Sequence, residues 1–206
     1  LFFRCRNVRL EDASFLDCPC WTIWLIGCEQ VNVHRIRITG DQRMINNDGI
    51  DIDGCRDVTV SDSFFRTGDD CVVVRAIQQV QDEEAVCEHV TVSNCVLNRL
   101  CQGIRIGCPS DNVIRHCAFS NLVIDGGGNG INIDNPRRYL HEDGASLDLH
   151  DVVFSGITIN SGRFPIRIYV EDGVGLQRLS GLSFSDIRAR CRQPLSLTGS
   201  EETFIT

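Results

Sequence analysis

The stretch "CRDVTV" at residues 55–60 decides the fold, because the chain carries its pattern three times. "CEQVNV" (28–33) precedes it by 27 residues and "CEHVTV" (87–92) follows it by 32, so all three fit C-x-x-V-x-V. Repeats of this length indicate a solenoid, in which each repeat buries its apolar face against the next one.

A second repeat extends this pattern toward the C-terminus. "FSNL" (119–122), "FSGI" (154–157) and "FSDI" (184–187) recur at intervals of 35 and 30 residues. Apolar and polar residues alternate in runs such as "VTV" (58–60) and "IRI" (104–106), and a period of 2 is typical of strands. We therefore predict an all-β chain that forms a parallel β-helix, with successive coils about 4.8 Å apart.

Two other readings of the pattern are weaker. A β-sandwich has turns about every 8–12 residues, and its strands do not share a cysteine register. The one stretch that could be helical, "AIQQVQDEEAV" (76–86), is interpreted as a loop insertion.

The twelve cysteines are explained by the repeat. Cys28, Cys55 and Cys87 are expected at one position in successive coils, as small buried thiols rather than as disulfides. Cys95 and Cys117 are expected to form a second short stack. No cysteine and histidine set has compact zinc-finger spacing, so the sequence predicts neither a metal site nor a cofactor.

Charge narrows the class of partner. All 20 basic residues are arginine, 28 residues are acidic, and the net charge is −8. This balance argues against nucleic acid and anionic membrane surfaces, whereas local arginines can still bind an acidic polysaccharide. No run of 18 apolar residues is present, so no membrane span is expected.

Aspartates are concentrated in "NNDGIDIDGCRDVTVSDSFFRTGDDC" (46–71), which holds seven of them. Aligning "NNDGIDID" with "TGDDCVVV" one coil later places Asp48 beside Asp69 and Asp70. The remaining aspartates of the stretch are expected to finish turns or an outer strand face, where Asp commonly bonds backbone amides: Asp51, Asp53, Asp57 and Asp62. The outward positions of the same sheet are expected to form a ladder of Asp51, Val72, Arg105, Asn132 and Arg167.

These residues resemble glycoside hydrolase family 28, the polygalacturonase-like pectinases. "NNDGIDID" and "TGDDC" look like that family's N-T-D-G-x-D and G-D-D-C signatures, and the separation of 21 residues between Asp48 and Asp69 suits them. The resemblance covers roughly residues 15–190. It implies a right-handed parallel β-helix that hydrolyses galacturonate-rich polysaccharides with inversion.

The resemblance also implies roles for three residues. Asp69 would be the general acid that protonates the glycosidic oxygen, and Asp48 and Asp70 would hold and deprotonate the attacking water. Inverting glycosidases need two carboxyl groups roughly 6.5–9.5 Å apart with water between them, a separation that neighbouring coils can supply. Crowding carboxylates also raises the pKa of one of them, as an acid requires.

The residues that should read the substrate depart from the family. Its G-H-G signature is here Cys101-Gln102-Gly103, so Gln102 replaces the histidine. Its R-I-K signature, which binds the substrate carboxylate, falls on "NGINID" and becomes Asn132 and Asp134. An aspartate facing a uronate would repel it.

Two explanations of this departure stay open. Arg105 and Arg167 could supply the guanidinium that Asn132 lacks, with Tyr169 beside Arg167 to stack on a sugar face. Alternatively, the sugar at the cleavage point is neutral, such as rhamnose or galactose. The pair Arg137-Arg138 is interpreted as a solvated loop rather than as part of the groove.

The predicted function is hydrolysis of a galacturonan or rhamnogalacturonan-like pectin by three aspartates. The alternatives are a polysaccharide lyase that uses Ca²⁺, and a catalytically degenerate β-helix that binds glycans or serves a structural role. We expect residues 1–206 to be one β-helix domain within a longer chain, located extracellularly or in the periplasm as the resemblance implies. The loops at 76–86 and 134–148 are candidates for closing the groove.

Overall fold

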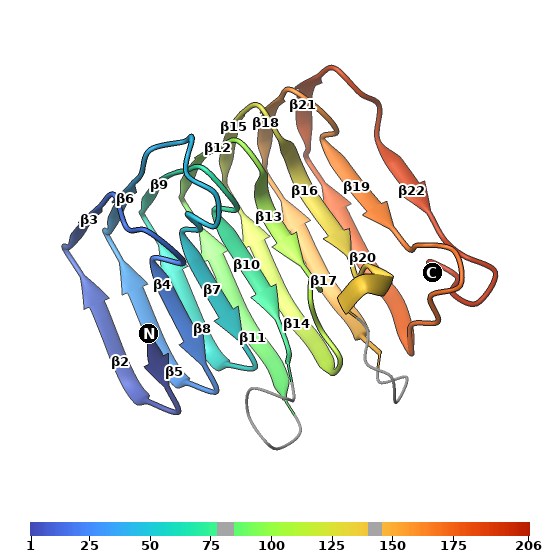
Figure 1. Cartoon of the computed structure of the whole chain (residues 1–206), viewed down its shortest axis with the longest axis horizontal. Helices are drawn as coiled ribbons and strands as arrows, with labels where there is room; N and C mark the ends of the chain where they lie inside the picture. The colour runs from blue at the N-terminus through green and yellow to red at the C-terminus, as the bar shows by residue number, and fades with distance from the viewer. Residues whose placement is uncertain (78–84, 140–145) are drawn as a thin grey trace.

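A computed structural model describes residues 1–77, 85–139 and 146–206. The chain winds as a right-handed parallel β-helix, as predicted, with three sheets running along its long axis (Figure 1). Every strand pairing in the three sheets is parallel, and each coil contributes one strand to each sheet in turn.

The three sheets, here called A, B and C, contain eight, seven and seven strands. Sheet A consists of β1 (Phe2–Phe3), β4 (Ile23–Ile26), β7 (Ile50–Asp53), β10 (Val72–Arg75), β13 (Gln102–Ile106), β16 (Asn129–Asp134), β19 (Ile166–Tyr169) and β22 (Ser196–Thr198). Sheet B consists of β2 (Arg6–Glu11), β5 (Glu29–His34), β8 (Arg56–Ser61), β11 (Val86–Ser93), β14 (Val113–Ser120), β17 (Asp148–Ser155) and β20 (Arg178–Ser185). Sheet C consists of β3 (Ser14–Leu16), β6 (Arg37–Thr39), β9 (Phe64–Thr67), β12 (Val96–Arg99), β15 (Val123–Gly126), β18 (Thr158–Ser161) and β21 (Arg188–Cys191).

The cysteine repeat stacks as predicted. Arg56 pairs with both Glu29 and Glu88, which places Cys28, Cys55 and Cys87 one above another just inside sheet B. All three are buried, and the Cys28 amide donates to Cys55 Sγ at 3.3 Å. All twelve cysteines lie in the described ranges and carry free thiols. The stack therefore acts as apolar packing between coils.

The proposed second cysteine stack is wrong. Cys117 lies inside β14 and pairs with Val152 of the next coil. Cys95 instead precedes β12, at the corner between sheets B and C. The two sequences look alike because both cysteines stand before an apolar pair, yet they occupy different positions in their coils.

The second repeat forms an aromatic column in sheet B. Phe119 pairs with Phe154, and Phe154 with Phe184, so the three rings lie in register on β14, β17 and β20. Their centroids are 5.0 and 4.8 Å apart and the rings are nearly parallel. Stacking of this kind adds to the stabilisation that burial of each ring provides.

Most of the residues with left-handed backbone lie in two columns that bend the coils. One column lies inside the strands of sheet B: Asn7, Gln30, Asp57, His89, His116, Asp151 and Gly181. The other turns the chain from sheet B to sheet C: Asp12, Arg35, Asp62, Asn94, Asn121, Gly156 and Asp186. Glycine, asparagine and aspartate adopt this conformation most readily, which explains why they recur here. Asp62 is a turn residue and Asp57 lies on the exposed face of β8, two of the roles that were predicted for them.

Sheet A has one register that differs from the prediction. Val72 pairs with Ile50 and Ile104, so it points into the core. Val73 is the residue that pairs with Asp51 and Arg105 on the outward ladder, which continues to Asn132 and Arg167. The run Val72–Val74 is apolar throughout, so alternation could not show which valine faces inward.

The structure describes only part of the two stretches, 76–86 and 134–148, that were predicted to close the groove. Of the stretch 76–86, residues 78–84 lie outside the described ranges, and Val86 already belongs to β11. Of the stretch 134–148, residues 140–145 lie outside them. A short 3₁₀ turn, η1 (Arg137–Tyr139), follows β16. Within the described part of the chain, no helix has the length and apolar character needed to cross a membrane.

Candidate active site

The three predicted catalytic aspartates meet in one pocket at the start of sheet A. Asp48 lies just before β7, and Asp69 and Asp70 lie just before β10 of the next coil. The Gly49 amide donates to the Asp70 carbonyl at 2.9 Å, so Asp48 and Asp70 occupy the same position in adjacent coils. The pocket is small, about 100 Å³, and its lining is Trp21, Asn46, Asp48, Asp69, Asp70, Arg75, Arg105, Cys108 and Pro109.

Asp70 is held by two donors from the following coil. Its Oδ1 accepts the Gln102 amide at 2.9 Å, and its Oδ2 accepts Arg105 Nη1 at 3.3 Å. The residue is only 2% exposed. Burial raises the pKa of Asp70 to about 6, although the neighbouring Arg105 opposes this shift.

Asp48 is the carboxyl group that most resists ionisation. Burial, followed by repulsion from Asp51, Asp70 and Asp69, raises the pKa of Asp48 to about 9. Its Oδ1 has no hydrogen-bond partner among the described residues. Asp48 therefore holds a proton at neutral pH and has an unused oxygen beside the pocket.

Asp69 is the most open of the three. It is half-buried, and its Oδ2 accepts the Asn46 amide at 3.1 Å. Oxygen atoms of Asp69 and Asp70 lie within 4.8 Å of each other and of Cys101 Sγ. Asp69 is thus the carboxyl group of the three that is most exposed to solvent.

A buried ion pair that was not predicted from the sequence lies beside this cluster. Arg75 donates through Nη2 to Asp51 Oδ1, and its guanidinium lies 4.7 Å from the ring centroid of Trp21. The side chains of Arg75 and Asp51 are 5% and 0% exposed. Burial outweighs the attraction of Arg75 and raises the pKa of Asp51 to about 7. Arg75 stands at the end of "DDCVVVR", and the unbroken valine run before it hid which face of the strand it lies on.

The prediction of outer or turn roles for Asp51 and Asp53 is therefore wrong in one respect. Both point outward from the strand, yet neither is exposed, because other residues cover this face of sheet A. Asp53 does bond a backbone amide, that of Ile77 at 3.0 Å, as expected. Asp51 instead pairs with Arg75, so the aspartates of this stretch form a buried cluster.

Arg105 lies between two carboxylates. Besides Asp70, it contacts Asp134, with Nε–Oδ1 at 3.3 Å and Nη2–Oδ2 at 3.4 Å. These two carboxylates raise the pKa of Arg105 above its ordinary value despite its burial. The positive charge of Arg105 is thus neutralised within the protein, and Asp134 binds this arginine.

Arg167 is a more exposed cation, two strands beyond Arg105 on sheet A. Its Nη1 donates to Asn132 Oδ1 at 3.4 Å, and its guanidinium lies 4.3 Å from the ring centroid of Tyr169. Both Arg167 and Tyr169 are half-buried, whereas Asn132 is buried beneath them. Among the described residues no carboxylate neutralises Arg167. A guanidinium on an aromatic face can bind a carboxylate while the ring packs on a sugar.

Gln102 reaches the pocket through its backbone. Its amide nitrogen binds Asp70, while its side-chain Nε2 contacts Cys101 Sγ at 3.4 Å and its buried Oε1 has no partner among the described residues. The other arginines considered lie elsewhere. Arg137 bonds Glu171 and the Asp172 carbonyl and is exposed, as the solvated-loop interpretation predicts.

The acidic cluster is a poor cage for Ca²⁺. This ion takes 6–8 oxygen ligands, whereas the group of potential ligands here is Asp69, Asp70 and Cys101. Both oxygens of Asp70 already accept hydrogen bonds, and burial raises the pKa of the Cys101 thiol, so its sulfur stays protonated.

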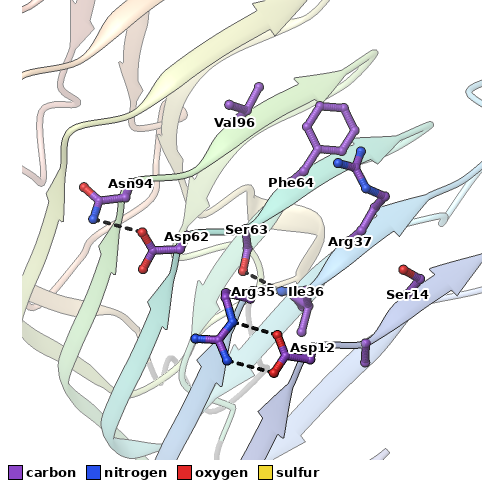
Figure 2. Close-up of a pocket in the computed structure, with 11 residues that line it drawn as sticks. Asp12, Ser14, Arg35, Ile36, Arg37, Asp62, Ser63, Phe64, Asn94 and Val96 are labelled. Carbon is purple, nitrogen blue, oxygen red and sulfur yellow. Dashed lines mark hydrogen bonds and ion pairs between the residues drawn. The ribbon is translucent and has the colours of Figure 1, made fainter.

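A wider hollow of about 680 Å³ lies at the corner between sheets B and C (Figure 2). Its charged groups are already paired, as in the two hydrogen bonds from Arg35 to Asp12. Arg37 lies over the Phe64 ring, 4.6 Å from its centroid. Its aspartates, Asp12 and Asp62, are left-handed turn residues whose carboxylates already bind Arg35 and Asn94.

The chain is similar in sequence to proteins of one family. The family model "Glycosyl hydrolases family 28" matches residues 1–190. A probable polygalacturonase of Arabidopsis thaliana is 28% identical over 183 residues, 75% of this chain and 40% of the relative. An exopolygalacturonase of the same plant is 26% identical over 181 residues, 76% of this chain and 42% of the relative. The chain thus spans about two fifths of the length of these curated relatives.

Two solved structures have a similar fold. A hyperthermoactive exopolygalacturonase from Thermotoga maritima has a TM-score of 0.69 at 20% identity, covering 98% of this chain and 53% of that one. An endo-xylogalacturonan hydrolase from Aspergillus tubingensis has a TM-score of 0.61 at 13% identity, covering 100% and 67%.

Proposed function

This chain belongs to glycosyl hydrolases family 28, and we propose that it hydrolyses glycosidic bonds of a pectin-type polysaccharide. The observation that carries the proposal is the convergence of Asp48, Asp69 and Asp70 from adjacent coils in one pocket. Clustered carboxylates in a partly buried pocket are the groups that acid–base hydrolysis of a glycoside uses.

The proposed mechanism uses one carboxyl group as an acid and two to activate water. Asp69, which is half-buried, protonates the departing glycosidic oxygen. Asp70, fixed by the Gln102 amide and Arg105, accepts a proton from the attacking water, while Asp48 orients that water. Oxygen atoms of Asp69 and Asp70 lie within 4.8 Å of each other, closer than the roughly 6.5–9.5 Å that is typical of the two carboxyl groups of inverting glycosidases. Inversion therefore rests on the family resemblance, and it requires the water to attack the face opposite the leaving group.

The electrostatics of the pocket support Asp70 as the base. With a pKa of about 6, Asp70 is ionised at neutral pH. Asp48, with a pKa of about 9, stays protonated and can donate a hydrogen bond to the water through the carboxyl group that has a free oxygen. Neighbouring carboxyl groups with different pKa values can thus take different roles toward one water, with Asp70 as the proton acceptor and Asp48 as the hydrogen-bond donor.

The charges around the pocket favour a substrate that alternates neutral and acidic sugars, such as a rhamnogalacturonan. Asp70 and Asp134 together outweigh Arg105, so the cleavage point presents no surplus positive charge to a uronate. Arg167 on Tyr169, farther along sheet A, offers a cation to the uronate of a neighbouring sugar. Gln102, Asn132 and Asp134 then shape the groove without binding a carboxylate.

The test is product analysis of the protein and its Asp69→Asn variant on galacturonan and rhamnogalacturonan oligosaccharides. We expect cleavage with inversion by the unchanged protein and a loss of at least about 10²-fold in kcat for Asp69→Asn, the usual contribution of a general acid. Asp186→Asn is the matched control, because Asp186 is an exposed left-handed residue and asparagine tolerates that conformation.

Three results would overturn the proposal. Unchanged turnover in Asp69→Asn would remove the acid role. Unsaturated uronate products that disappear with EDTA would indicate the calcium-dependent lyase instead. Oligosaccharide binding without any cleavage would indicate a degenerate glycan-binding β-helix.

A further inference from the structure

A second cluster of chemically capable side chains lies on sheet B, away from the aspartates of sheet A. Histidines occur in three consecutive strands of this sheet, His89 in β11, His116 in β14 and His150 in β17. The His89 and His116 rings stack at 5.7 Å, and the His116 and His150 rings meet edge to face at 6.1 Å. Asp151 follows His150 on β17.

The left-handed column brings two of these groups together. His116 and Asp151 occupy the same bend in adjacent coils, with φ of 52° and 55°. Both side chains are exposed on sheet B, and His116 Nε2 lies 3.6 Å from Asp151 Oδ2. The next residue in the column is Gly181, and a Cβ there would lie 2.8 Å from Asp151 Oδ1. Glycine thus leaves room for the Asp151 carboxylate.

His150 is oriented by a buried carboxylate. Its Nδ1 lies 2.8 Å from Asp148 Oδ1, and Arg178 of β20 contacts the same carboxylate with Nε–Oδ1 at 3.1 Å and Nη2–Oδ2 at 3.2 Å. A histidine that donates its Nδ1 proton to a carboxylate keeps an unprotonated Nε2, which can then bind a metal. The structure thus contains the carboxylate–histidine arrangement that orients metal ligands in proteins.

We propose that His116, His150 and Asp151 form a binding site for a divalent transition metal, with Zn²⁺ as the ion that fits the donors best. One ligand atom from each of the three lies within 4.8 Å of the others. Tetrahedral zinc holds such ligands about 2.0–2.2 Å from the ion, which places them about 3.3 Å apart. Small rotations of the exposed His116 and Asp151 side chains close that difference.

The ligand types select the ion. Two imidazoles and one carboxylate suit zinc and its neighbours among the transition metals, whereas Ca²⁺ and Mg²⁺ prefer oxygen donors alone. A water molecule would complete the tetrahedron on the solvent side. The metal would connect β14 to β17 and so tie two consecutive coils together.

The neighbouring triplet of Glu88, His89 and His116 is a weaker alternative. The Glu88 carboxylate is already bound by Arg115 at 2.8 Å and Arg56 at 3.4 Å. Displacing two guanidinium groups would oppose metal binding there. The carboxylate of Asp151, by contrast, is 59% exposed and contacts only His116 among the ion pairs of the described residues.

The experiment is titration of the EDTA-treated and dialysed protein with Zn²⁺ by calorimetry, together with the visible absorption of bound Co²⁺. We expect one site per chain, and at least a tenfold loss of affinity in His116→Ala and in His150→Ala. Asp148→Asn should lose about 10–100-fold, the usual effect of removing the partner of a ligating histidine. Zn²⁺ should raise the melting temperature of the unchanged protein but not of His150→Ala.

Two further variants should bind Zn²⁺ with unchanged affinity and so test the ligand set. His34→Ala is the control, because His34 contacts Ser61 and Asp62 on the same sheet but lies outside the cluster, and it should bind zinc normally. His89→Ala should also keep its affinity. Loss of affinity in His89→Ala with none in His150→Ala would overturn the proposed ligand set, and absence of a Zn²⁺ heat or Co²⁺ spectrum in the unchanged protein would overturn the site.

Discussion

The activity of the pocket should depend on pH through Asp70, whose pKa is about 6. Two opposing effects set this value. Burial raises that pKa, and Arg105 at 3.3 Å lowers it. If Asp70 is the base, the enzyme loses its base as the pH falls through this value, since the protonated form predominates below the pKa. We expect kcat/KM to rise with pH and to reach half its plateau near about pH 6.

The variant Arg105→Met tests the cause of that profile. Removing the guanidinium takes away the interaction that favours ionised Asp70, so the acidic limb should move to higher pH. The measurement is the pH dependence of kcat/KM for both proteins on one oligosaccharide, with Arg37→Met as a control on sheet C. An unshifted limb, or one displaced to lower pH, would show that Asp70 is not the titrating base.

Much of the pocket could be predicted at this scale because its signal lies in short motifs. Asp48 precedes one strand of the repeat, and Asp69 and Asp70 precede the equivalent strand of the next coil. Aligning the two coils therefore brings the three aspartates together. Arg75 and Trp21 could not be found in that way. Their importance depends on how they cover the outer face of sheet A, and that covering is a tertiary feature without periodicity.

The left-handed columns bend the coils. A substitution to glycine should therefore have opposite effects on stability inside such a column and outside it. Gln30 is exposed and has a φ of 57°, a conformation that costs a residue other than glycine roughly 1–2 kcal/mol. Gln30→Gly should therefore leave the free energy of unfolding unchanged or raise it by up to about 1 kcal/mol. Urea denaturation followed by circular dichroism measures this change.

Thr91→Gly is the matched control. Thr91 is an exposed residue of β11 on the same sheet and is absent from the left-handed column. There glycine should lower the free energy of unfolding by about 0.5–1 kcal/mol, since it adds only conformational freedom to the unfolded chain. Equal losses in both variants would contradict the role assigned to the column.

The strands themselves were the most predictable elements. Cys28, Cys55 and Cys87, and the column of Phe119, Phe154 and Phe184, repeat both in sequence and in space, because each coil packs on the same part of its neighbour. The predicted register was wrong at Val72, which lies within an unbroken apolar run. The predicted stack of Cys95 and Cys117 was wrong because a short sequence alone does not show which part of a coil a residue occupies.

The stability of the whole molecule should depend on pH through its buried aspartates. Burial raises the pKa of Asp48 to about 9, of Asp51 to about 7 and of Asp53 to about 6. An unfolded aspartate has a pKa of about 3.9, so the folded protein binds more protons than the unfolded chain between these values. The stabilisation is complete below about pH 4 and is lost as the pH rises through each folded pKa.

We therefore expect the melting temperature to fall between about pH 5 and pH 9. Each extra proton held by the folded state changes the free energy of unfolding by about 1.4 kcal/mol per pH unit. Asp41, whose pKa Arg43 lowers to about 2, acts in the opposite sense, but only below that window. The measurement is differential scanning calorimetry at constant ionic strength.

Asp48→Asn isolates the largest contribution. An uncharged amide cannot ionise, so this variant should be more stable than the unchanged protein at about pH 8 and should show a flatter pH dependence. Asp186→Asn, an exposed substitution, should leave the slope as it was. A melting temperature that rises with pH in the unchanged protein would show that folding lowers the pKa values of these carboxyl groups instead of raising them.

One of the free thiols is placed where a covalent label could detect ligand binding at the aspartate pocket. Cys20 is the one exposed thiol among the twelve, and it precedes Trp21, whose side chain lines the aspartate pocket. A fluorescent maleimide attached at Cys20 would place its dye beside that pocket, while most other thiols are shielded by the coils around them. Arrival of a sugar chain could then be followed as a change in emission even in variants that never cut it.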